Sequence, residues 1–264
     1  MTAIIFPSDY FSPKKVDESF IEEFNAFKEA GYNTYLINLD GDDKVFPKLE
    51  DEDLIYRGWM LTEDQYSKLN ERVNGKLIVN VREYLSSHHF HGWYSSIEQF
   101  TIKSIVSDEK NAVTDFERSS LDKAFIKDYV KSLKSGKGSI VDSPEDVKRA
   151  LSDMHKYRGF IEGGVVLREV KSFDEKTENR FFVLNGEVYS KSKDDEMLSF
   201  AKEVAKNHNA LFFSLDIAKL ETGELLVIEI GDGQVSEAKD WNVNDFVSIF
   251  SNLKLSNKNK KKLK

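Results

Sequence analysis

The sequence predicts a mixed fold, with an α/β unit first and α+β elements after it, and three observations indicate this order. Short apolar strands alternate with amphipathic helices over residues 1 to about 85, a pattern typical of a small and mostly parallel sheet. Two later pairs of β-prone runs are joined by the turn residues Asn185-Gly186 and Thr222-Gly223, which predicts two β-hairpins. Amphipathic helices are predicted before the first hairpin and between the two.

The first unit contains four predicted strands and two predicted helices. Strands are expected at 3–6, 32–39, 53–56 and 76–81. Helices are expected at 16–30 and 62–73. The first helix is followed by Gly31, a residue that favours a helix C-terminus. The second begins with a capping box, because Thr62 is followed three residues later by Gln65.

Three histidines lie in the segment 82–120, which connects the first unit to the rest of the chain and for which we predict a helix near 93–99. Imidazole is a common metal ligand, so His88, His89 and His91 suggest a metal site. Their spacing fits no helix face, and one face of a strand would carry only His89 and His91. We therefore interpret them as loop histidines.

The rest of the chain supplies a second domain and a tail. Strands are predicted at 124–130 and 165–170, hairpins at 179–190 and 211–230, and helices at 143–157, 197–208 and 243–253. Residues 254–264 are rich in lysine and contain almost nothing apolar, which predicts a disordered tail. We divide the chain into an N-terminal α/β domain at 1–100, a second domain at 101–253 and this tail.

A glycine- and lysine-containing loop is predicted at 132–139, with the sequence SLKSGKGS. It is no Walker A motif, because Lys137 is followed by Gly138 where that motif has serine or threonine. A basic glycine loop can still close over phosphates with its backbone amides and lysines. A solvated linker is the alternative interpretation, and the loop sequence leaves both open.

The second hairpin is predicted to place two acids opposite each other. If Thr222-Gly223 is the loop, Leu220 faces Leu225 and Asp216 faces Glu229. Like charges in such a pair destabilise a sheet unless a cation lies between them. Asp232 follows on a glycine-rich turn, and carboxylate oxygens suit magnesium. We favour a magnesium site over a solvated hairpin with ordinary surface acids.

The first hairpin shows the opposite charge pattern. The register set by Asn185-Gly186 places Arg180 opposite Lys191, and Arg168 lies on the preceding strand. Opposed cations favour a bound anion such as a phosphate. Exposed charges at a sheet edge are the alternative interpretation.

Composition excludes several classes of function. The net charge of −8 and a pI near 5.3 argue against a general nucleic-acid binder. The chain has no cysteine, which excludes disulfides, thiolate metal sites and a cysteine nucleophile. It has no run of about 18 apolar residues and no signal-like N-terminus, so we expect a cytoplasmic protein without a membrane partner.

Four segments, FIKDYVKS, VVLREV, ENRFFVLNGEV and SLDIAKLETGELLVIEIGDGQ, together resemble the ATP-grasp superfamily over roughly residues 100 to 235. More narrowly, they are similar to a divergent clade with two characteristic arginines and one lysine. This clade includes the eukaryotic cell-division-cycle protein that assembles translation initiation factor two. The resemblance implies the ATP-grasp fold, in which an N-terminal α/β domain precedes two α+β subdomains that clamp ATP.

The resemblance also implies which residues bind the nucleotide. Lys127 is expected to bind ATP phosphate, with Lys131 assisting. The loop that contains Lys137 is expected to close over the nucleotide. The implied hinge against adenine is formed by Leu167, Arg168, Glu169 and Val170.

Catalytic and metal-binding roles are implied in the same way. Arg168 and Arg180 are expected to stabilise the phosphoryl group during its transfer. The implied magnesium ligands are Asp216, Glu229 and Asp232. One departure concerns Gly231, which stands where most of the superfamily has an asparagine that binds a second metal ion. Asp232 is the candidate to replace that asparagine.

The reaction that the resemblance implies is transfer of phosphate from ATP to a substrate carboxylate, followed by attack of an amine on the acyl phosphate. The substrates are expected to be small molecules or a peptide or protein. Arg57, at the end of an N-terminal strand, is the candidate for binding the substrate carboxylate, and a surface arginine beside core aromatics is its alternative. An ATP-binding assembly factor that performs no ligation and a kinase of a small metabolite are the competing functions.

Overall fold

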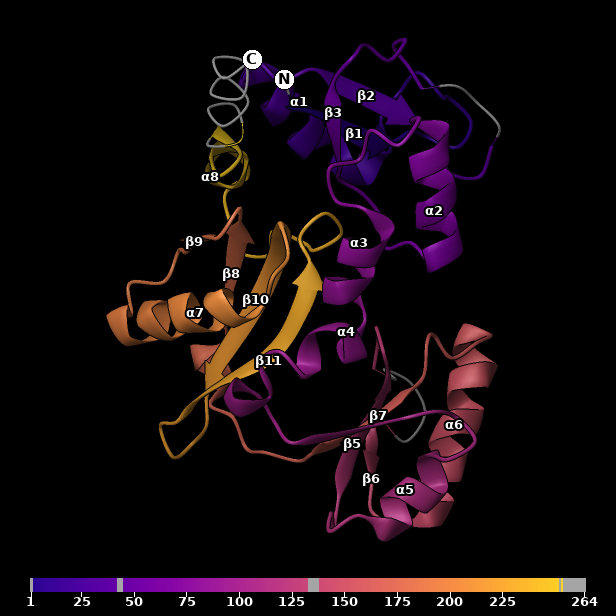
Figure 1. Ribbon diagram of the computed structural model, residues 1–264, viewed down its shortest axis with the longest axis vertical. Coiled ribbons are helices and arrows are strands. Elements are labelled where there is room, and N and C mark those ends of the chain that lie inside the picture. Colours follow the sequence, from indigo (N-terminus) through magenta and orange to yellow (C-terminus); the bar gives the residue numbers. More distant parts are fainter. Residues whose placement is uncertain (1, 42–44, 133–137, 252, 254–264) are drawn as a thin grey trace.

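A computed structural model shows a chain built on three sheets, and it describes residues 2–41, 45–132, 138–251 and 253 (Figure 1). The strand orders are β2-β1-β3, β4-β7-β5-β6 and β11-β10-β8-β9. The first sheet is parallel and the other two are antiparallel. The predicted combination of an α/β unit with α+β elements is therefore confirmed.

The first sheet is built around β1 (Thr2–Pro7), every residue of which is buried. Its partners are β2 (Thr34–Ile37) and β3 (Asp53–Tyr56), and the helices of this unit are α1 (Ile21–Glu29) and α2 (Glu63–Arg72). The predicted capping box of Thr62 and Gln65 is confirmed. The predicted strand at 76–81 is wrong, because it is reduced to one bridge between Leu54 and Leu77.

The connecting segment forms short helices that sequence reasoning missed. A second capping box, from Asn80 and Glu83, begins α3 (Val81–His88), and α4 (Phe90–Tyr94) follows directly. A 3-10 turn covers Glu98–Phe100, so the helix predicted near 93–99 was misplaced. The interpretation of His88 as a loop residue is also wrong, since it ends α3. Burial, with smaller effects from His89 and nearby lysines, lowers the pKa of His88 to about 3.

The second sheet packs against two helices over a common apolar core. Its strands are β4 (Ser104–Ser107), β5 (Ala124–Asp128), β6 (Ile140–Val141) and β7 (Val165–Glu169). The helices are α5 (Ala112–Arg118), which was not predicted, and α6 (Pro144–Arg158). Ser143 caps the start of α6 with its side chain, and Gly159 ends the helix at φ +83°, a left-handed conformation that glycine adopts without strain.

The third sheet contains both predicted hairpins. Its strands are β8 (Asn179–Leu184), β9 (Glu187–Tyr189), β10 (Phe212–Lys219) and β11 (Leu225–Asp232), and α7 (Asp195–Asn207) packs on one face (Figure 1). Asn185 and Gly186 have φ of 53° and 80°. Two central residues with positive φ define a type I′ turn, so the predicted turn is confirmed.

The acidic hairpin reaches its predicted pairing by an unexpected route. Lys219, and not Leu220, pairs with Leu225, so the loop is longer than two residues. A bulge after Asp216 then shifts the register by one residue, and Asp216 faces Glu229 as predicted. The two departures cancel, because a bulge adds one residue to one strand only.

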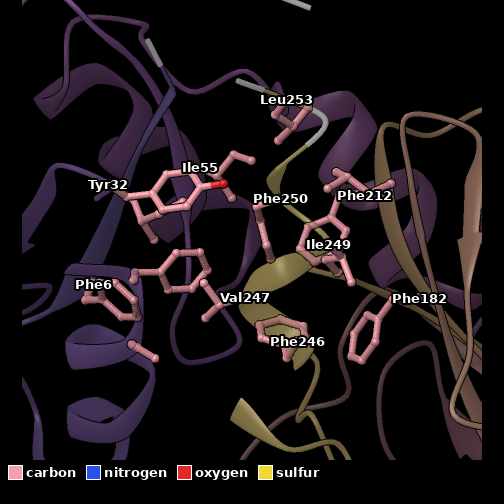
Figure 2. Close-up of a cluster of buried hydrophobic side chains, with 14 of the residues drawn as sticks. Phe6, Tyr32, Ile55, Phe182, Phe212, Phe246, Val247, Ile249, Phe250 and Leu253 are labelled. Carbon is pink, nitrogen blue, oxygen red and sulfur yellow. The ribbon is translucent and has the colours of Figure 1, made fainter. Parts of the chain in front are cut away.

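A closing helix joins the first unit to the third sheet through an aromatic cluster (Figure 2). This helix, α8 (Val243–Ser248), carries Phe246, and Phe250 follows it. The Phe250 ring lies 5.0 Å from that of Phe27 on α1 and 5.2 Å from that of Phe212 on β10. Two parts of the chain far apart in sequence therefore share one core. None of the helices that the structure describes has the length and apolar character needed to cross a bilayer.

Replacing Phe250 by alanine should lower the free energy of unfolding by about 3–5 kcal/mol, because the ring is fully buried between the two units. Urea denaturation measures the loss. Phe11→Ala is the matched control, since Phe11 is 87% exposed. Equal midpoints for the two variants would contradict the packing described here.

Candidate active site

Three charged side chains form a row across the third sheet. Asp216 on β10 is paired with Arg180 on β8 and with Glu229 on β11. Residues directly opposite each other on neighbouring strands place their side chains on one face. One cation and two carboxylates therefore lie side by side on the surface that faces away from α7.

Asp216 is neutralised by protein cations. Arg180 donates from Nε to Oδ1 at 2.7 Å and from Nη2 to Oδ2 at 2.6 Å, a two-point contact. Lys239 donates to Oδ2 at 3.2 Å. Asp216 is only 4% exposed, and a buried carboxylate requires such partners. The arginine supplies the positive charge that the opposed acids need.

The predicted pairing of Arg180 with Lys191 is wrong. Strand β9 ends at Tyr189, so Lys191 lies beyond the ladder. Its ammonium group forms an ion pair with Asp245 instead. Two cations therefore do not oppose each other here, and Arg180 is directed to Asp216 on its other neighbouring strand.

Glu229 links the third sheet to the second. Its Oε1 accepts a hydrogen bond from Nζ of Lys127 on β5 at 2.5 Å. Lys127 is 5% exposed, whereas 40% of the Glu229 side chain is exposed. Glu229 thus faces a buried ammonium on one side and open space on the other. A carboxylate in this position can exchange one cation for another.

Arg168 on β7 approaches the same point from below the row. Its Nη1 donates to the backbone carbonyl of Ile228 at 2.7 Å, and its Nη2 donates to Oγ1 of Thr101 at 3.2 Å. The guanidinium lies over the ring of Phe90 at 5.2 Å. Burial lowers the pKa of Arg168 to about 10, and the guanidinium stays charged at neutral pH. Its Nε is buried without a hydrogen-bond partner.

Two cavities meet at these charges. The first, of about 660 Å³, lies between the second and third sheets and is lined by Lys127, Lys131, Arg168 and Glu229 among others. The second, of about 720 Å³, lies between the N-terminal unit and the third sheet and is lined by Arg180, Lys131 and Glu229 among others. Because Lys131 and Glu229 line both, a group bound in one cavity lies beside a group bound in the other.

Apart from Arg168, the residues of the predicted hinge lie outside the described lining of both cavities. Leu167 is fully buried in the core of the second sheet. Glu169 pairs with Lys171 at 2.8 Å, and Val170 is 41% exposed. Lys137 lies outside the residues that the structure describes, and so does most of its loop.

Asp232 is not brought to the acidic pair, contrary to the sequence prediction. Side chains alternate along a strand, so Asp232, three residues after Glu229, points to the opposite face. There it is 1% exposed and accepts hydrogen bonds at Oδ1 from the backbone and side chain of Gln234. Its Oδ2 has no hydrogen-bond partner. Burial raises the pKa of Asp232 to about 7.

Arg57 lines the second cavity but is held by the protein itself, which corrects its assignment to the substrate. It is 2% exposed and makes a two-point contact with Glu23, at 2.9 and 2.7 Å. Its Nη1 donates to the carbonyls of Gly233 and Ser236. The guanidinium therefore ties the first unit to the segment after β11.

Sequence reasoning missed the contribution of the segment that follows β11. Lys239 reaches Asp216, and the carbonyl of Glu237 accepts a hydrogen bond from Nη1 of Arg180 at 2.8 Å. Ser236 hydrogen-bonds Ser214 on β10. These residues belong to neither a strand nor a helix, so no periodicity could have placed them beside the row.

Comparison with solved structures defines the class of protein. D-cycloserine synthetase DcsG aligns with a TM-score of 0.62 at 13% identity, covering 94% of this chain and 97% of DcsG. The macrocyclase MdnC bound with precursor peptide MdnA, from Microcystis aeruginosa, aligns with a TM-score of 0.59 at 14% identity, covering 96% and 100%. The ATP-grasp ligase PsnB with its minimal precursor gives 0.57 at 10%, covering 94% and 97%. The protein has the ATP-grasp fold.

A sequence family makes this class more specific. The model of an ATP-grasp domain, family 3 of the clade named for its two arginines and one lysine, matches residues 92–253, and the chain belongs to this family. The predicted superfamily and clade are confirmed by this match. No curated protein matches the chain in sequence.

Asp232 makes the stability of the fold depend on pH. Its folded pKa of about 7 lies above the ordinary value of 3.8, so its proton stabilises the fold below pH 4 and is lost as pH rises through 7. Asp232→Asn should remove this fall in stability, by at most about 4 kcal/mol at pH 8. Denaturation at pH 5 and pH 8 measures it. Asp240→Asn, at an exposed acid, is the control, and an unchanged pH dependence in Asp232→Asn would contradict the assignment.

Proposed function

We propose that this protein is an ATP- and magnesium-dependent ligase that joins a carboxylate to an amine through an acyl phosphate, with a peptide or protein as one substrate. The observation that carries the proposal is the convergence of Lys127, Arg168, Arg180, Asp216 and Glu229 where two cavities meet. A donor and an acceptor of a phosphoryl group require such a junction.

The first cavity suits the nucleotide. Lys127, Lys131 and Arg168 line it, and their charges would neutralise a triphosphate. Backbone groups at Glu169 and Val170, near the end of β7, are the proposed contacts for adenine. Phosphoryl transfer depends on positioning and charge neutralisation more than on a protein nucleophile. A site made of lysines, arginines and acids meets that need.

Asp216 and Glu229 fit a magnesium ion. They offer hard oxygen ligands from paired positions on one face, and Glu229 is open to the cavities. Magnesium is usually held by one or two carboxylates together with substrate phosphates, so two acids suffice without Asp232. When bound, the ion would neutralise phosphate charge at the position of transfer.

The second cavity suits the carboxylate that accepts the phosphoryl group. Arg180 stands at its border with the nucleotide cavity and would orient that carboxylate. A carboxylate oxygen attacks the terminal phosphorus, and ADP departs with the electron pair of the broken P–O bond. The amine then attacks the acyl carbon, and phosphate leaves. The cavity has room for more than one amino-acid residue, and the structures of MdnC and PsnB were solved with precursor peptides of those proteins.

Incubation of the purified protein with Mg-ATP, amino acids and short peptides tests the reaction class. We expect ADP, phosphate and a product whose mass has increased by amide formation with loss of water. Hydroxylamine should trap the acyl phosphate as a hydroxamate. A stable phosphorylated product would instead indicate a metabolite kinase. Retention of ATP without turnover, with one co-purifying protein, would indicate an assembly factor, and either outcome would overturn the proposal.

Replacement of Glu229 by glutamine should lower the turnover number by at least about 100-fold, because a charged ligand at the point of transfer is lost. Its fold should persist, since the side chain is 40% exposed. Glu224→Gln, at an exposed acid near the turn of the same hairpin, should retain full activity. Thermal unfolding of both variants checks folding, and full turnover in Glu229→Gln would rule out the assigned role.

A further inference from the structure

Two histidines and a glutamate come together away from the charged row. They are His88 at the end of α3, the adjacent His89, and Glu162 in the turn before β7. One ligand atom from each lies within 4.8 Å of the others, among the residues that the structure describes. The three come from two segments that are far apart in the sequence, and α3 and α4 run between the first sheet and the second (Figure 1).

The ligand atoms are free of competing partners. Nε2 of His88, Nε2 of His89 and Oε1 of Glu162 are all buried without a hydrogen-bond partner. His88 is 6% exposed and His89 is 7% exposed. Buried polar atoms nearly always have partners in folded proteins, so three orphaned atoms in one place indicate a missing ligand. We propose that His88, His89 and Glu162 bind a zinc-class divalent cation.

The geometry matches the preference of this class of ion. Nε2 of His89 lies 3.5 Å from Oε1 of Glu162. Two ligands in a tetrahedral zinc site with bonds of about 2.0–2.1 Å are separated by about 3.4 Å. Imidazole nitrogen favours zinc, copper or nickel over magnesium. The site is therefore chemically distinct from the pair of acids proposed to hold magnesium.

The break between two helices brings the adjacent histidines side by side. His89 adopts an extended conformation at φ −93° and ψ 133° between α3 and α4. The two rings consequently lie 5.6 Å apart and are tilted by 32°. Adjacent residues within a continuous helix would instead point about 100° apart around its axis.

Glu162 is held in place by its own backbone. Its N–H donates to Oδ2 of Asp128 at 3.3 Å, and its carbonyl accepts from the N–H of Tyr129 at 3.2 Å. Gly163 follows at φ +76°, where a Cβ atom would lie 2.5 Å from the ring of Tyr129. The turn can approach β5 this closely because glycine occupies that position.

Three protein ligands leave a fourth coordination position. His88 and Glu162 also line a small cavity of about 350 Å³, together with Lys131 and Met60. The fourth position therefore faces space that a water molecule can enter. The proposed ion would bridge the helical connector to the second sheet, beside the two larger cavities.

Zinc titration of the metal-free protein in excess Mg²⁺ tests the proposal. We expect one zinc ion per chain, and Co²⁺ should give the visible absorption of a tetrahedral site. His89→Gln and Glu162→Gln should each weaken zinc binding by more than about tenfold. Failure of the native protein to bind zinc, or undiminished binding in both variants, would overturn it.

Two control variants separate this site from other possibilities. His155→Gln removes another histidine paired with a glutamate, Glu109, but that pair is about half exposed and should not affect zinc binding. Glu229→Gln should also leave zinc binding unchanged. Loss of zinc binding in Glu229→Gln would place the ion at the proposed magnesium site instead, and would contradict this inference while leaving the proposed ligase reaction intact.

Discussion

A buried ammonium group is tolerated beside a carboxylate, and the ion pair between Lys127 and Glu229 meets this need across the boundary between two sheets. The same constraint acts on Asp216, which is almost fully buried and is held by Arg180 and Lys239. Each charge in the row therefore depends on a neighbour from another strand or segment. The relative position of the second and third sheets is coupled to charge pairing at the point where the two cavities meet.

The segment after β11 connects this row to the N-terminal unit. Gly233 and Ser236 offer carbonyls to Arg57, and Gln234 accepts a hydrogen bond from the backbone of Tyr56 at 3.1 Å. Glu237 offers its carbonyl to Arg180 on the other side. Contacts from the first unit thus reach the catalytic row through a few backbone groups. The N-terminal unit forms one wall of the second cavity and also fixes the segment that orients Arg180 and Asp216.

Local chemistry was predictable from the sequence where a few neighbouring residues decide it. Asn185-Gly186 fixes a type I′ turn, and the opposition of Asp216 to Glu229 was correct. The pairing was correct only because a longer loop and a bulge cancelled, which residue types alone do not encode. A capping signal at Asn80 was readable and was overlooked in favour of a strand.

Partners from distant segments could not be predicted in this way. Arg57 was assigned to a substrate because nothing local reveals that Glu23, Gly233 and Ser236 satisfy its guanidinium. Arg180 was assigned to Lys191 because β9 was taken to be longer than it is. Asp232 was counted among the acids, although alternation along a strand that continues past Glu229 turns it to the other face. Each error concerned where a strand ends or which chain segment lies beside it.

The pairing of the acids with protein cations suggests how the site accommodates its proposed ligand. A magnesium-bound triphosphate carries both a cation for the carboxylates and anions for the lysines and arginines. Binding it would exchange the partner of Glu229 from Lys127 to the metal, while Lys127 would turn to a phosphate. Every buried charge keeps an opposite charge before and after the exchange, so the electrostatic cost of opening the ion pair is offset. Asp216, which is much less exposed than Glu229 and held at two points by Arg180, is the more rigid of the two acids and fixes the position around which this exchange takes place.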